Sequence, residues 1–204
     1  FVVMLRKPSD LVYALHATYL LGVMEDEEDF TTAWKLQVDR AQGRNIPKTC
    51  PEPKLLQYGE VGKLGAQVSR LLGQVDRRQV HFIIYDDFKA NTQKTYQDLL
   101  QFLGIPDDFR SDFKAINQAQ VTKNKSLGKV ISVLTQNKFI YRIKRTLGLT
   151  MGEGPLVKLL HKNRMVQKRV ALSDDFKAEL KAYFKSDIKD LEAILKRDLS
   201  HWYD

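Results

Sequence analysis

The sequence of 204 residues is poor in the residues that build disulfides and metal centres. Its single cysteine, Cys50, has no second cysteine with which to form an internal bond. The four histidines, His16, His81, His161 and His201, are scattered, and with Cys50 they do not give the spacing of a zinc site. We therefore expect no internal disulfide and no metal. The cysteine usage suits a cytoplasmic protein, although any targeting signal would precede Phe1.

Long apolar runs are also missing. No stretch approaches the about 18 uninterrupted apolar residues of a membrane span, and the first residues do not follow the order of a signal peptide. We expect no membrane anchor within these residues. The hydrophobic fraction of 43% is still sufficient for one sizeable core, and a single domain over residues 1–204 is the default.

Several catalytic motifs are lacking as well. The sequence contains no Gly-rich phosphate loop of the Walker type, no G-x-S-x-G and no metal-binding motif. His16 falls inside a predicted helix, where it is either a general base or, as we favour, a histidine packed on the helix face. No complete catalytic apparatus is visible, so the sequence assigns no catalytic residue.

Positive charge is plentiful but unevenly placed. The formal net charge is +8, and residues 113–204 hold 19 Lys and Arg against 9 Asp and Glu, a local net charge of +10. Within residues 113–170, Glu153 is the only acidic residue. This asymmetry favours an anionic partner, such as a nucleotide, a sulfated or phosphorylated substrate, or a nucleic acid. The alternative is a solvated basic face without a partner.

Two apolar runs predict strands that are buried on both faces of a parallel sheet. These are residues 1–5 (FVVML) and residues 80–85 (VHFIIY). The first is followed by a helix over residues 8–21, and the second by a helix that Asn91 caps and Gly104 ends. Further helices are predicted over about 30–42, 56–72, 127–147 and 174–195, the last with Phe176, Leu180, Phe184, Ile188, Leu191 and Leu195 on one face.

Two parallel strands alone do not make a stable sheet. The rest of the sequence offers no other good strand candidate, so we expect the neighbouring strands to precede Phe1. On this interpretation the chain is the C-terminal portion of a larger α/β domain.

The carboxyl ends of the two strands carry the best candidates for a ligand site. Arg6 follows the first strand, where a parallel sheet binds ligands, and backbone N–H groups at residues 9–11 could add donors for a phosphate. Tyr85 ends the second strand at the same edge, where its ring could lie against a planar base. The plainer alternatives are a surface Arg6 that caps a carbonyl or pairs with Asp10, and a Tyr85 ring that closes the core. Lys7 either assists or faces water.

Two polar segments admit more than one interpretation. Asp86 and Asp87 could form an acid/base pair, but neighbouring residues point in different directions, which favours turn and helix-entry roles. Residues 122–126 (TKNKS) form a short basic loop with cations, an amide and a hydroxyl, a composition that can surround a phosphate. The candidates in this loop are Lys123, Asn124, Lys125 and Ser126.

The order of these motifs resembles the sulfotransferase family that uses 3′-phosphoadenosine 5′-phosphosulfate (PAPS), particularly its bacterial members. VMLRKPSDLVYA is similar to the family's strand followed by R-N-P-x-D/E-x-x-x-S, and VHFIIYDDFKAN to the strand followed by Y-E-D-F/L-K-x-[DN]-P. LLQFLGIP resembles the F-L-G-[LI]-P that comes next, and residues 187–202 resemble the closing helix. The resemblance spans nearly the whole chain.

The resemblance implies an α/β fold with a P-loop-NTPase-like parallel sheet, flanking helices and a helix-rich C-terminal half. Arg6 matches the arginine that holds the 3′-phosphate of the nucleotide, while Lys7 replaces the family's Asn and Ala14 its Ser. Tyr85 matches the tyrosine that contacts adenine, and Asp86 replaces the usual Glu. The loop of residues 123–126 lies about where the family closes over the nucleotide.

The implied activity is transfer of a sulfuryl group from PAPS to a hydroxyl or amine of a small molecule or glycan, without a metal. The family's phosphosulfate loop and its base precede the strand that begins here, so no catalytic residue is carried over. The alternative is a basic module, using residues 114–169, that binds nucleic acid or another polyanion, but no RNA-binding pattern accompanies it, so we expect no nucleic acid. A nucleotide kinase would require a Walker loop upstream.

Overall fold

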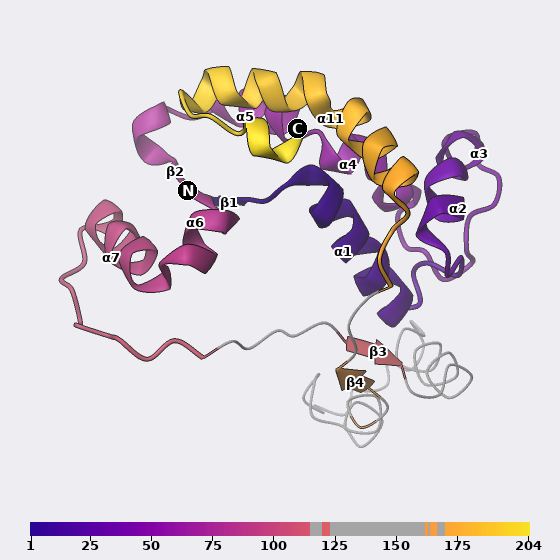
Figure 1. The fold of residues 1–204 in the computed structure, drawn as a ribbon, viewed down its shortest axis with the longest axis horizontal. Helices are drawn as coiled ribbons and strands as arrows, with labels where there is room; N and C mark the ends of the chain where they lie inside the picture. Colours follow the sequence, from indigo (N-terminus) through magenta and orange to yellow (C-terminus); the bar gives the residue numbers. More distant parts are fainter. Residues whose placement is uncertain (115–119, 123–161, 163, 167–169) are drawn as a thin grey trace, which may run out of the picture. The chain divides into compact units, whose positions relative to one another are not determined.

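The computed structural model of the protein describes residues 1–114, 120–122, 162, 164–166 and 170–204 (Figure 1). They divide into two compact units. The first comprises Phe1–Tyr13, Tyr58–Ile116 and Leu172–Asp204, and the second Ala14–Gln57 and Asn117–Ala171. The prediction of one domain over the whole chain stays a prediction, and the predicted helix over residues 127–147 lies outside the described residues.

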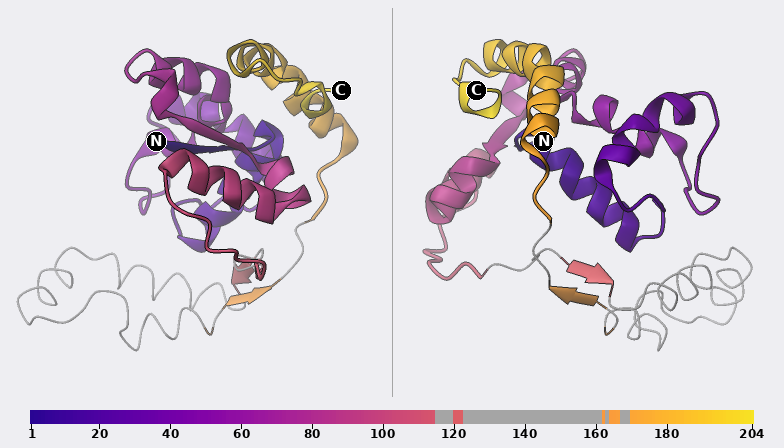
Figure 2. Two further views of the ribbon diagram at one scale, coloured as in Figure 1. Left: turned by 90° about the vertical axis from the view of Figure 1, so that its left-hand side faces the viewer. Right: turned by 45° about the vertical axis from the view of Figure 1, so that its right-hand side comes forward.

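The first unit contains the two strands that the apolar runs predict. β1 (Val2–Leu5) and β2 (His81–Ile84) pair in parallel, with Leu5 opposite Ile84 (Figure 2). Leu5, Ile83 and Ile84 are buried at the carboxyl ends of the strands, whereas Val2 and Met4 are about half exposed. The prediction of burial on both faces is therefore wrong for β1, whose alternate residues Val2 and Met4 are exposed. The described residues therefore form an α/β arrangement with a small parallel sheet, as predicted.

Each strand leads directly into a helix. α1 (Pro8–Leu21) begins with a proline, whose fixed φ suits the first helical position and whose missing N–H costs nothing there. After β2, α6 (Tyr85–Ala90) begins at Tyr85, so the strand ends one residue earlier than its apolar run suggests. The carboxyl ends of both strands are thereby joined to helices by very short connections.

α7 (Thr92–Leu103) begins and ends as its sequence predicts. The Asn91 side chain accepts a hydrogen bond from the backbone N–H of Lys94, and Gly104 adopts the left-handed conformation with φ +67°. This helix packs on α6 and β2.

One predicted helix, over residues 56–72, is in fact three elements. They are η1 (Pro53–Leu56), α4 (Tyr58–Gly62) and α5 (Leu64–Leu72), with the interruption before α5 at Lys63, whose ψ is +78°. At the break, the Asp187 carboxylate accepts hydrogen bonds from the backbone N–H groups of Gly65 and Ala66. A side chain distant in sequence therefore caps the new helix, which local periodicity does not reveal.

α11 (Asp174–Leu195) provides the core of the first unit, packing along α5 and α4 (Figure 1). Ser173 caps it by accepting a hydrogen bond from the Phe176 N–H. The predicted stripe is buried at Phe176, Leu180, Phe184, Ile188 and Leu191, while Leu195 is only half buried. The first unit also contains two short 3-10 helices, η2 (Arg77–Gln79) and η3 (Ser200–Trp202), and Trp202 is buried, whereas η1 belongs to the second unit.

The second unit holds the remainder of α1, α2 (Phe30–Lys35) and α3 (Gln37–Ala41). The predicted single helix over residues 30–42 is divided at Leu36, and Asp29 caps its first part. β3 (Gln120–Thr122) and β4 (Arg164–Val166) form an antiparallel pair. The expectation that the chain offers only two strands was wrong, because three-residue strands paired across more than 40 residues leave little local signal. Among the described helices, none is long and apolar enough to cross a membrane.

Candidate functional site

Arg6 and Tyr85 meet at the carboxyl ends of the paired strands. Arg6 follows Leu5, and Tyr85 follows Ile84, the residue opposite Leu5 in the register. The guanidinium carbon of Arg6 lies 4.8 Å from the centre of the Tyr85 ring, a cation–π contact. The two residues, 79 positions apart, are thus neighbours in the folded chain, as their places at the ends of parallel strands predict.

The surroundings of Arg6 leave part of its guanidinium accessible. Its side chain is 32% exposed, and its Nη2 lies 4.0 Å from Oδ2 of Asp10, at the limit of an ion pair. An exposed ion pair of this kind is weak. Even if Arg6 pairs with Asp10, its guanidinium keeps other N–H donors that could bind a ligand. Lys7, beside it, is half buried.

The expectation that the backbone N–H of Leu11 is a donor for a phosphate was wrong. The N–H of Leu11 donates to the carbonyl oxygen of Lys7 at 2.9 Å, as the first hydrogen bond of α1. It is therefore not a free donor for a phosphate, and any donors at this helix start must come from earlier residues.

Tyr85 is half buried, so it is not sealed in the core. Its ring centre lies 6.2 Å from that of Phe88, one turn further along α6. Because the Arg6 guanidinium covers part of the Tyr85 ring, a planar ligand must use the remaining ring surface or its edge. The predicted contact between Tyr85 and a planar base is therefore limited to that remaining surface.

The predicted loop residues Lys123, Asn124, Lys125 and Ser126 lie outside the described residues. Their part in a nucleotide site stays a prediction, as does the role of Lys7. Of the predicted set, the described structure brings Arg6 and Tyr85 together.

Asp86 and Asp87, which follow Tyr85, bind the C-terminal segment (residues 197–204). Oδ2 of Asp86 accepts a hydrogen bond from the indole N–H of Trp202 at 2.8 Å and lies 3.3 Å from Nε2 of His201. Asp87 forms a two-pronged ion pair with Arg197, with Nη2 donating to Oδ1 at 2.7 Å. The two carboxylates lie in the first turn of α6 and bind separate partners. This arrangement agrees with helix-entry roles and not with an acid/base pair.

The electrostatics of this contact favour the charged form of Asp86. Burial raises the pKa of Asp86, but hydrogen bonds from Trp202 and His201, together with nearby positive charge, leave the pKa below its ordinary value. The hydrogen bonds to Asp87 raise the pKa of Arg197. These contacts were not predicted from the sequence, where their only local signal is a pair of acids beside a strand end and an aromatic and basic cluster near the C-terminus.

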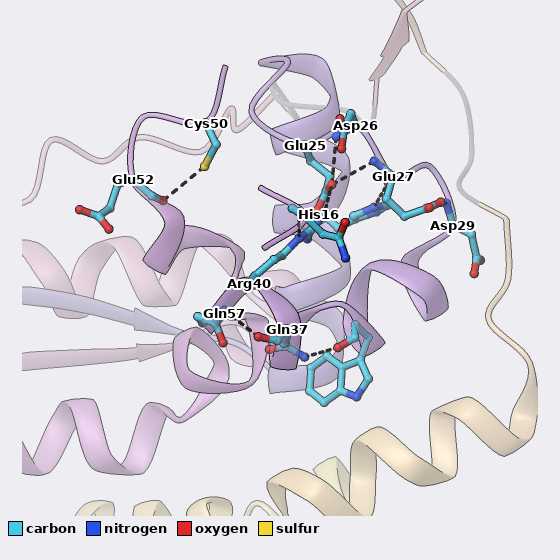
Figure 3. Close-up of polar contacts among 12 residues, drawn as sticks. His16, Glu25, Asp26, Glu27, Asp29, Gln37, Arg40, Cys50, Glu52 and Gln57 are labelled. Atoms are coloured by element: carbon cyan, nitrogen blue, oxygen red, sulfur yellow. Dashed lines mark hydrogen bonds and ion pairs between the residues drawn. The ribbon is translucent and has the colours of Figure 1, made fainter. Parts of the chain in front are cut away.

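A second group of titratable side chains is buried in the other unit (Figure 3). Glu25 and Arg40 form a bidentate ion pair, with both N–O distances 2.7 Å and both side chains 0% exposed. Glu25 also accepts from the backbone N–H groups of Asp26 and Glu27, and Arg40 donates Nε–H to the carbonyl of Asn45. This network has a structural role, because the charges of Glu25 and Arg40 interact with each other and with backbone groups.

His16 belongs to the same buried group. Its Nε2 lies 2.8 Å from the carbonyl oxygen of Glu27, and its ring packs against Phe30 with centres 5.1 Å apart. Burial lowers the pKa of His16. With an exposure of 2%, it is packed as the sequence analysis favoured, and a general-base role has no access to substrate. Within the part of the chain that the structure describes, no cluster of His, Cys, Asp and Glu could hold a metal ion.

Comparisons with known proteins give one informative match. No protein-family model matches the sequence, and no curated protein does. The fold is similar to the crystal structure of a sulfotransferase from Alicyclobacillus acidocaldarius, with a TM-score of 0.62 and 22% sequence identity. The match covers 100% of this chain and 57% of that one, so the chain spans little more than half of its structural neighbour. The chain is therefore an α/β protein whose fold resembles that of a sulfotransferase.

Proposed function

We propose that the protein is a sulfotransferase, or the nucleotide-binding part of one, that uses PAPS. In this reaction an acceptor hydroxyl or amine attacks sulfur, and the bond from sulfur to the bridging phosphate oxygen breaks. The acceptor loses its proton, and 3′,5′-adenosine diphosphate leaves. Such transfers depend mainly on positioning and on stabilising the charge of the leaving group.

The contact between Arg6 and Tyr85 is the observation that carries this proposal. It places a permanent, forked cation and an aromatic surface side by side at the carboxyl edge of a parallel sheet, where such sheets bind nucleotides. A nucleotide that carries a phosphate and a purine on one ribose needs a cation for the phosphate and an aromatic surface for the purine a short distance apart. The similarity of fold to a sulfotransferase supports the same assignment.

The residues present suit the nucleotide in part. Arg6 keeps accessible donors that could bind the 3′-phosphate, and Tyr85 offers ring surface to adenine. Lys7 and residues 123–126 are proposed as further cations and donors around the phosphates. Ala14, where the family has a serine, supplies no hydroxyl, so Arg6 should carry a larger share of the binding.

PAPS supplies the activated sulfuryl group, and the chain's described residues supply binding. No residue is assigned to deprotonate the acceptor. The P-loop-NTPase-like organisation of the complete sheet is part of the proposal, as is a small-molecule or glycan acceptor.

The proposal is tested by thermal unfolding of the intact protein with 3′,5′-adenosine diphosphate. At about 100 times Kd a ligand stabilises by about 2.7 kcal/mol, which for a domain of this size raises Tm by about 5 to 10 °C. Arg6→Ala should abolish most of this shift. Arg78→Ala is the matched control, because Arg78 is an exposed arginine that precedes β2 at its other end. A wild-type Tm that does not respond to the nucleotide refutes the cofactor assignment.

A further inference from the structure

The C-terminal segment (residues 197–204) is attached to the chain on two sides. On one side it binds Asp86 and Asp87 through Trp202, His201 and Arg197. On the other, Glu192 of α11 accepts hydrogen bonds from the Leu199 N–H at 2.6 Å and from the Tyr203 hydroxyl at 3.0 Å. The segment therefore links the end of α11 to the first turn of α6.

The link is anchored by burial as well as by hydrogen bonds. Leu199 is 0% exposed and Trp202 is 1% exposed. Packing therefore holds the indole ring in place independently of the hydrogen bond from its N–H to Asp86. The hydrogen bond from this fixed N–H to a carboxylate is charge-assisted, and such bonds are stronger and more directional than bonds between neutral groups.

The turn that receives this bond carries the candidate nucleotide-binding tyrosine. Tyr85 is the first residue of α6, a helix of six residues, and Ile84 before it provides no side-chain cap. A short helix without a side-chain cap at its start has little to fix its first turn, so contacts from outside must do so. Asp86 provides such a contact one residue after Tyr85.

We propose that Asp86 is a positioning residue, which through Trp202 holds the first turn of α6 so that the Tyr85 ring faces the Arg6 guanidinium. The importance of this contact for nucleotide affinity rests on the proposed function, whereas the positioning itself does not. The Asp86 and Asp87 side chains are similarly exposed, by 44% and 47%. Asp87 contributes less, because its partner Arg197 is 42% exposed, whereas the indole that donates to Asp86 is buried.

Two variants separate positioning from general stability. Asp86→Ala removes the acceptor, and Trp202→Phe keeps a buried ring but removes the N–H donor. Each should weaken binding of 3′,5′-adenosine diphosphate to the intact protein about tenfold in titration calorimetry. Asp86→Asn retains an oxygen that can accept from the indole and should restore affinity to within about threefold of wild type.

Tyr203→Phe is the matched control. It removes a hydrogen bond between the same segment and a carboxylate, but on the α11 side, so it should leave the nucleotide affinity unchanged. If Tyr203→Phe weakens binding as much as Trp202→Phe does, the effect is one of general stability and the positioning role is refuted.

A second readout needs no nucleotide. Because the Arg6 guanidinium lies over the Tyr85 ring, the ring should shift the NMR resonances of the Arg6 side-chain protons upfield, and Arg6→Lys identifies those resonances. In Trp202→Phe they should move toward the values of an exposed arginine, and in Tyr203→Phe they should stay. Unchanged Arg6 resonances in Trp202→Phe overturn the positioning role. If the wild type binds no nucleotide, the proposed function fails while this measurement still decides the inference.

Discussion

The Gly65 backbone N–H donates to the Asp187 carboxylate at 2.8 Å, across 122 residues of sequence. The Ala66 N–H donates to the other carboxylate oxygen at 2.9 Å. Asp187 thereby caps α5 from the middle of α11 and fixes how the two helices pack. The contact explains why α5 begins after a break at Lys63.

Removing this cap should destabilise the protein measurably. Replacement of a capping side chain by alanine costs about 1 kcal/mol, in a range of about 0.5 to 2, so Asp187→Ala should lower the free energy of unfolding by that amount in urea titration. Asp190→Ala, an exposed acid on the same helix, is the control and should have little effect. Equal stability of the Asp187→Ala variant and wild type would contradict the capping role.

The close approach of α4 and α11 depends on the absence of a side chain at Gly62. A Cβ at this position would lie 2.5 Å from Phe184 ring atoms and 2.9 Å from a Val12 methyl group. Gly62→Ala should therefore cost about 1 to 3 kcal/mol through overpacking. Gly73→Ala serves as the control, because Gly73 has φ −72° and its nearest neighbour would be 3.5 Å away. A Tm of Gly62→Ala equal to that of Gly73→Ala would disprove the packing argument.

The buried ion pair of Glu25 and Arg40 should be costly to break. Arg40→Met leaves the Glu25 carboxylate in a site with 0% exposure, without its opposite charge, and a loss of about 3 to 5 kcal/mol is expected. Arg78→Met removes an ion pair from an exposed side chain and should leave the denaturation midpoint unchanged. Similar urea midpoints for the two variants would show that the buried pair does not hold the second unit together.

His16 makes folding stability depend on pH. Because burial lowers its pKa below the value of about 6.5 expected in the unfolded chain, the unfolded state binds its proton first as pH falls. The stability due to neutral His16 is complete above about pH 6.5 and is lost as pH falls through the folded pKa. Urea titrations at about pH 7.5 and about pH 5.5 should show this loss in wild type and a smaller one in His16→Phe. An identical pH dependence in both proteins would exclude His16 as its source.

Local sequence predicted the parts of the fold that depend on local chemistry. The helix starts predicted at residues 8 and 174 and the cap predicted at Asn91 are confirmed, because caps and the first helical turn act within a few residues. The stripe from Phe176 to Leu191 is buried because helical periodicity determines which face a helix buries. The neighbouring positions of Arg6 and Tyr85 followed from a general property of parallel sheets.

Features that depend on distant partners were not predictable in this way. The break at Lys63 requires Asp187, and the roles of Asp86 and Asp87 require Trp202 and Arg197. Each of these partners is more than 100 residues away in sequence, and no local pattern identifies it. The pairing of β3 with β4 likewise depends on contacts between distant segments.

The proposed function requires that Arg6 recognises a phosphate on the 3′ position of an adenine nucleotide held beside Tyr85. Titration calorimetry of wild type and Arg6→Ala with 3′,5′-adenosine diphosphate and with 5′-adenosine monophosphate measures this recognition. A charge-assisted hydrogen bond contributes about 1.5 to 3 kcal/mol, so wild type should prefer the 3′-phosphorylated nucleotide by roughly 10- to 100-fold. In Arg6→Ala that preference should nearly vanish. Equal affinities of wild type for the two nucleotides, or a preference that survives in Arg6→Ala, would show that Arg6 does not recognise the 3′-phosphate.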